Sequence, residues 1–187
     1  MSWFPAIPGW DGIHPAMVQF PIALLIAVPA LLLVSLLTLK SWRTWACAAL
    51  LLMALGTIGA WLAVGSGHAA AQLVDKTGPL AAAIRAHEVM AVNARNLFTL
   101  LTVIFAAILI LTSMLKTPLA APVRISLYAV FFVIYVGALG VLAHTADRGG
   151  RLVHEYGVRA MMVQPAPPPA PATSTAPSDR KPGGEGE

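Results

Sequence analysis

Charged residues are scarce in this chain of 187 residues, where Asp, Glu, Lys and Arg together make up 11%. Soluble domains carry about 25%. With 58% hydrophobic residues, too little polar surface remains to cover an ordinary soluble core, and the composition indicates a membrane protein. The basic residues are scattered, and many stand beside the ends of apolar runs. That pattern argues against a nucleic-acid partner and for contact with membrane lipid.

Cysteine and the common catalytic motifs are also lacking. The single cysteine, Cys47, excludes an internal disulfide, a thiolate metal cluster and covalent c-type haem, which needs C-x-x-C-H. The sequence contains no H-E-x-x-H, P-loop or G-x-G-x-x-G motif, so the usual hydrolase and nucleotide-binding signatures are absent. The first residues carry no Lys or Arg, which argues against a standard secretory signal.

Long apolar runs dominate what is present. A transmembrane helix needs about 20 apolar residues, and four segments without any Lys, Arg, Asp or Glu qualify: about 16–39, 45–64, 97–115 and 125–143. The third extends as a helix back to about residue 79, because Gly-Pro is followed there by good helix formers. We therefore expect an all-α, integral membrane four-helix bundle over residues 1–163. The Pro-rich tail, 164–187, should be disordered.

The short loops predict the orientation of this multi-pass chain. Lys40 and Arg43 follow the first span, Lys116 and Arg124 separate the last two spans, and neither loop holds an acidic residue. The positive-inside rule then places these loops in the cytoplasm and both termini outside. Acidic residues are missing from the spans, so the usual signature of a proton-coupled transporter is absent.

All five histidines fall on the outer side of this topology, near the ends of the spans: His14, His68, His87, His144 and His154. Two of them stand above small residues on one helical face. Gly137 and Gly140 precede His144 at helical spacing, and His87 is followed in the same way by Ala91, Ala94 and Phe98. Small residues next to a histidine leave room for a flat ligand.

This pattern suits a b-type haem held by two imidazoles. The favoured ligands of the haem iron are His87 and His144, with His14 and His68 in reserve, and Arg95, Arg148 and Arg151 are the available partners for the propionates. The same histidines also suit a metal ion such as copper or zinc. The third interpretation has no cofactor, because small-residue faces also serve helix packing.

Two stretches carry a family resemblance. "HPAMVQFPIALL" (14–25) and "GGRLVHEYGV" (149–158) resemble the opening and closing motifs of the bacterial family called domain of unknown function 2231, whose members are expected to have four membrane helices. His87 matches that family's histidine before the third span. The chain departs from the pattern at Gln19, where a second histidine is common, and at His154 and Tyr156, where Tyr and His are exchanged.

The resemblance implies a multi-pass protein of the bacterial inner membrane with both termini periplasmic. Some similar proteins are fused to Rieske or c-type cytochrome domains, which implies a redox setting. We therefore expect an electron carrier rather than an enzyme, exchanging electrons with a periplasmic cytochrome or a membrane redox complex. The alternatives are a non-redox structural or assembly subunit and a periplasm-facing metal handler. "GGRLVHEYGV" itself suggests a turn and a short extended piece, either a lid over the histidines or a surface hairpin.

Overall fold

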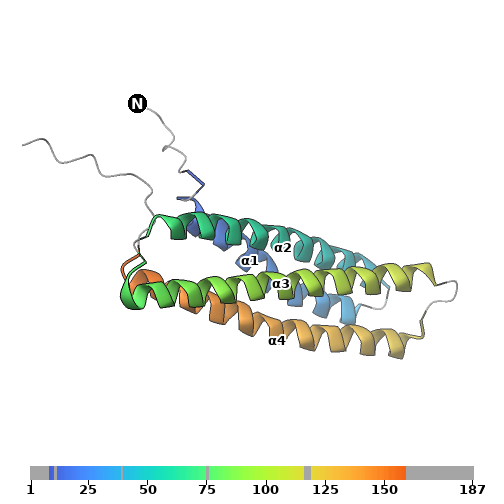
Figure 1. Cartoon of the computed structure of the whole chain (residues 1–187). Helices are drawn as coiled ribbons and strands as arrows, with labels where there is room; N and C mark the ends of the chain where they lie inside the picture. Colours follow the sequence, from blue (N-terminus) through green and yellow to red (C-terminus); the bar gives the residue numbers. More distant parts are fainter. Residues whose placement is uncertain (1–8, 11, 39, 75, 116–118, 159–187) are drawn as a thin grey trace, which may run out of the picture.

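The chain folds as a bundle of four antiparallel helices (Figure 1). The computed structural model describes residues 9–10, 12–38, 40–74, 76–115 and 119–158. Helix α1 runs over His14–Leu37, α2 over Trp42–Gln72, α3 over Gly78–Met114 and α4 over Ala121–His154. Helices α1 and α3 each pack against both α2 and α4, so α1 and α3 lie diagonally across the bundle. The all-α, four-helix prediction is confirmed.

Proline shapes α1 without breaking it. Pro15 lies in the first turn, where a missing N–H costs no hydrogen bond. Pro21 and Pro29 lie inside the helix, which nevertheless continues to Leu37. Pro21 is buried against α2, so neighbouring chain covers the backbone that a proline leaves unpaired.

Helices α1 and α2 approach closely at two glycines of α2. A Cβ added at Gly56 would lie 2.8 Å from the side chain of Leu25, and one added at Gly59 would lie 3.0 Å from Phe20. Small residues at a membrane helix interface allow this approach. These two glycines therefore form part of the packing surface between α1 and α2.

Aromatic side chains of α3 and α4 fill the centre of the bundle. Phe105 stacks on Phe131 with ring centroids 4.8 Å apart, and Phe98 meets Tyr135 edge-on at 5.5 Å. Tyr135 is fully buried, and its hydroxyl donates to the carbonyl of Leu25 on α1 at 3.2 Å. The buried phenol therefore ties α4 to α1 as well as packing against α3.

The outer faces of the bundle are as apolar as its interior. Large hydrophobic side chains such as Leu51, Val103 and Val133 are more than half exposed. All four helices are long and apolar enough to cross a membrane. Lipid on the outside explains this surface, which water would penalise.

Two helices are longer than the sequence predicts. Helix α2 continues to Gln72, beyond the predicted span at 45–64, because Ser66 and Gly67 pack against α1. Helix α4 continues to His154, so the extended lid or hairpin predicted over 149–158 is wrong for most of its length. Gly149 packs within that helix against His87, and Arg151 pairs with Glu155 one turn on. The predicted disordered tail, 164–187, lies outside the described residues.

Candidate functional site

The antiparallel bundle gathers the histidines at one end, called here the histidine end and marked by His14, Ser66, His87 and Gly149. It consists of the start of α1, the end of α2, the first third of α3 and the end of α4. All five histidines lie on the helices, and the prediction that they share one end of the bundle is confirmed. Only two of the rings, those of His14 and His87, are packed against neighbouring helices.

His14 is held by the last turns of α2. Its Nδ1 lies 3.0 Å from the hydroxyl oxygen of Ser66, and that hydroxyl in turn donates to the carbonyl of Ala63 at 3.0 Å. A hydroxyl carries a single hydrogen, so we assign the Nδ1 hydrogen to His14, which donates to Ser66. In the neutral ring Nε2 then keeps a free lone pair, the state in which an imidazole binds a metal.

His87 is held by α4. A Cβ added at Gly149 would lie 2.9 Å from Cε1 of His87, so only glycine leaves room for the ring in this position. The Nδ1 of His87 is buried and makes no hydrogen bond to any part of the chain that the structure describes. Buried polar atoms are nearly always paired, so this nitrogen is an unusual feature.

The two helical hairpins repeat one arrangement. In the first, a histidine on α1 lies over Gly67 of α2, whose added Cβ would be 2.9 Å from Cε1 of His14. In the second, a histidine on α3 lies over Gly149 of α4 at the same distance. Each hairpin thus contributes one imidazole to the same end of the bundle.

Small side chains line the next layer of the interior. Ala63 on α2, Ala94 on α3 and Ala138 on α4 are buried. Ala94 lies between His87 and Phe98 along α3, and Ala138 lies one turn beyond Tyr135 toward the histidine end. The edge-on pair of Phe98 and Tyr135 forms the floor beneath this layer.

His144 does not face this interior. It is exposed, and its Nε2 accepts a hydrogen bond from Nε of Arg148 at 3.2 Å. The next residue, Thr145, faces α3 instead and donates to the carbonyl of Met90 at 3.4 Å. Gly137 and Gly140 are exposed with open space around them, so the expectation that they make room for a ligand inside the bundle is wrong.

The remaining predicted residues lie on the outside of the histidine end. His68 and His154 are exposed. The guanidinium of Arg95 stacks on the ring of Trp61 at 4.0 Å and donates to the side chain of Asn96. Arg151 donates to Glu155, and this hydrogen bond lowers the pKa of the Glu155 carboxyl. Of the three arginines, only Arg148 combines partial burial with an electrostatic influence on His87.

The histidine end offers two imidazoles, those of His14 and His87, as possible donors to a metal. Within the described ranges, no group of three or more His, Cys, Asp or Glu side chains is placed to hold a metal. A haem needs only two protein ligands, since the porphyrin supplies the others. The two half-buried imidazoles match that number, while the alanines of the next layer are buried and the Nδ1 of His87 has no partner among the described residues that would orient the ring.

The fold and this end of the bundle define a class: a four-helix membrane protein that presents one interior imidazole from each hairpin. The chain belongs to the family described as predicted membrane protein (DUF2231), whose family profile matches residues 11–161. The predicted family membership is therefore confirmed. Comparison with curated proteins and with solved structures gave no match.

Proposed function

We propose that this protein is a b-type haem carrier of the membrane, with His14 and His87 as the axial ligands. The observation that carries the proposal is the presence of two glycine-seated imidazoles, from separate hairpins, at one end of the bundle. The hydrogen bond from His14 to Ser66 supports it further, because an outer hydrogen bond at Nδ1 is the usual way to orient a ligating histidine. His144, exposed and bonded to Arg148, is the weaker candidate.

The chain's own residues would bind and orient the group. His14 and His87 would hold the iron, and Arg148, next to Gly149 on α4, would pair with a propionate. When bound, the haem itself supplies one-electron chemistry, and the protein sets its burial and orientation. This role is that of an electron carrier and needs no catalytic residue.

The partner in electron transfer would meet the histidine end. The described residues of the opposite end include Lys40, Arg43 and Arg124, and the sequence between the neighbouring spans holds no acidic residue, which favours the cytoplasm for that end. The histidine end would then face the periplasm of a bacterial inner membrane. A periplasmic cytochrome or a membrane redox complex is the corresponding partner class.

The absorbance spectrum of protein purified from a haem-replete host tests the proposal. We expect a Soret band and sharp α bands on reduction, and we expect His14→Ala and His87→Ala each to abolish them. His68→Ala and His144→Ala are matched controls at exposed positions and should leave the spectrum intact. Elution as a single species in size-exclusion chromatography shows that each variant is folded. A full spectrum in His14→Ala, with loss in His144→Ala, would restore the pairing of His87 with His144 and refute ours.

A bound copper ion is the second candidate, and one feature of the sequence favours it. A methionine follows each interior histidine by three residues, Met17 after His14 and Met90 after His87, and both are half-buried. Residues at this spacing share a helix face, and thioether with imidazole is a ligand set that suits copper. Elemental analysis of haem-free protein separates the two. Protein that contains neither haem nor metal would leave the structural or assembly role.

A further inference from the structure

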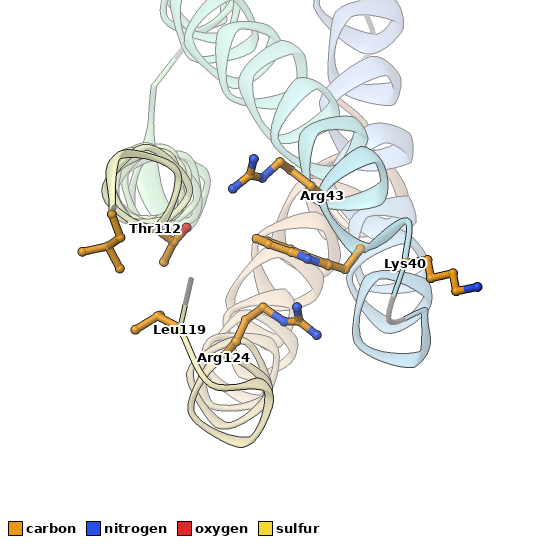
Figure 2. A pocket seen from close by; sticks show the side chains of 7 residues that line it. Lys40, Arg43, Thr112, Leu119 and Arg124 are labelled. Carbon is orange, nitrogen blue, oxygen red and sulfur yellow. The ribbon is translucent and has the colours of Figure 1, made fainter. Parts of the chain in front are cut away.

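The end of the bundle opposite the histidines contains a cavity of about 320 Å³ between three helices. We call it the basic end, marked by Lys40, Arg43 and Arg124. The cavity is lined by residues at the start of α2, the end of α3 and the start of α4, and by residues that flank these helices: Lys40, Trp42, Arg43, Thr112, Leu115, Leu119 and Arg124. Figure 2 shows Arg43 and Arg124 approaching it from α2 and α4.

Trp42 holds the two arginines in place. The guanidinium carbon of Arg43 lies 5.3 Å from the centre of the Trp42 ring, and that of Arg124 lies 4.7 Å from it. The ring is itself fixed edge-on against Tyr128 at 5.6 Å, and its backbone carbonyl accepts a hydrogen bond from Ser35. A guanidinium stacked on an aromatic face loses little freedom when its N–H groups bind an anion.

The arginines at the cavity, Arg43 and Arg124, have no carboxylate near them in the described part of the chain. The sequence contains no Asp or Glu between Asp11 and Asp75, and none between Glu88 and Asp147. Together, these two stretches of sequence include every residue of the basic end and of the connections between its helices. The only salt bridge among the described residues joins Arg151 and Glu155, at the histidine end. The positive charge at the cavity therefore has no counter-ion in this part of the chain.

The cavity also has an apolar side that continues along the outside of the bundle. Leu115 and Leu119 line it, and Leu111 and Met114 on the last turn of α3 are strongly exposed. A free phosphate would gain nothing from these side chains. A phospholipid would place its phosphate on the arginines and its acyl chains against the leucines.

We propose that this cavity binds the phosphate of an anionic phospholipid, with Arg43 and Arg124 as the phosphate ligands. Lys40 adds charge at the rim, and the exposed leucines of α3 receive an acyl chain. The site lies at the opposite end of the bundle from His14 and His87, so it is independent of the haem proposal.

Thermal unfolding of the full chain in a neutral detergent tests the site. Phosphatidylglycerol is added and compared with phosphatidylcholine, which has the same acyl chains but no net charge, and with inorganic phosphate. We expect phosphatidylglycerol to raise the melting temperature most. We expect Arg43→Gln and Arg124→Gln each to weaken its binding about five-fold. Arg85→Gln, an exposed arginine at the histidine end, is the matched control and should bind as the wild type does.

Arg43 and Arg124 lie on different helices, and either substitution alone tests the site. If Arg43→Gln or Arg124→Gln fails to fold, the other variant still gives a result. Arg124→Lys adds a further readout: it keeps the charge but loses stacking on Trp42, and should bind with intermediate affinity. Equal stabilisation by phosphatidylglycerol and phosphatidylcholine would overturn the proposal. So would inorganic phosphate that protects as well as the lipid, or a loss in Arg85→Gln equal to that in Arg124→Gln.

Discussion

Two adjacent glycines near the end of α4 allow the His87 site to be tested with almost no other change. Both Gly149 and Gly150 are helical. A Cβ added at Gly149 would lie 2.9 Å from Cε1 of His87, whereas a Cβ added at Gly150 meets nothing within 4 Å. Replacing either by alanine changes the same atoms in the same helix. The comparison therefore isolates the contact with the imidazole.

The expected magnitudes follow from that geometry. Alanine in a helix interior is favoured over glycine by roughly 0.8–1 kcal/mol, so Gly150→Ala should stabilise the protein by about that amount. Gly149→Ala gains the same propensity but forces the ring to move by several tenths of an ångström. Overpacking of this kind costs about 1–3 kcal/mol. Gly149→Ala should therefore be less stable than Gly150→Ala by about 1–3 kcal/mol.

Thermal unfolding followed by circular dichroism in detergent measures this difference. For a chain of this size, 1 kcal/mol corresponds to a shift of about 2–4 °C in the midpoint. The double variant with His87→Ala supplies the control, because without the ring Gly149→Ala should behave as Gly150→Ala does. If Gly149→Ala and Gly150→Ala have the same midpoint in the presence of His87, the imidazole does not lie over Gly149, and the account of this site is refuted.

Three further predictions concern the packing and the orientation. Gly56→Ala should lower the unfolding midpoint, because its Cβ would lie 2.8 Å from Leu25, whereas Gly137→Ala, with open space around it, should raise the midpoint slightly; equal effects would contradict the packing of α1 on α2. Tyr135→Phe removes the hydroxyl that donates to Leu25 and should cost about 0.6 kcal/mol in chemical unfolding; no measurable loss would show that this hydrogen bond does not form. A phosphatase reporter fused after residue 158 should be active and one inserted between α3 and α4 inactive, since the proposed orientation places the histidine end in the periplasm; the reverse pattern would invert the orientation.

The number and type of the helices could be predicted from the sequence because each span is a long run without charge. Length and apolarity alone decide that such a run is a membrane helix. The positions at which the helices end were harder to predict from the sequence. The segment 65–72 contains Gly, Ser and Gln, residues typical of loops, yet it stays helical because Ser66 and Gly67 meet His14 on α1. Only tertiary contact reveals that these residues belong to the helix.

The direction of each histidine could not be predicted, for a physical reason. In a soluble helix the apolar stripe identifies the inner face, but here the outer face meets lipid and is as apolar as the inner one. Successive residues of a helix point about 100° apart, so His144 and Thr145 face different directions. The sequence does not show which of the two faces α3. The small residues Gly137 and Gly140 pointed to the wrong face for the same reason. A usable signal was present elsewhere, in glycines near the ends of α2 and α4 that hold no helix cap or turn.

The two ends of the bundle differ in charge in a way that separates their roles. Within the part of the chain that the structure describes, the acidic residues all lie toward the histidine end: Glu88, Asp147 and Glu155. At that end Arg151 pairs with Glu155. The described cations at the basic end have no such carboxylate partner, so their attraction for an external anion is not offset within the described chain. A substitution at Arg124 should therefore change lipid binding without changing a spectrum that depends on His87, and the reverse should hold for His87→Ala. If the two readouts moved together, the bundle would couple its ends, and neither site could be assigned from its own variants alone.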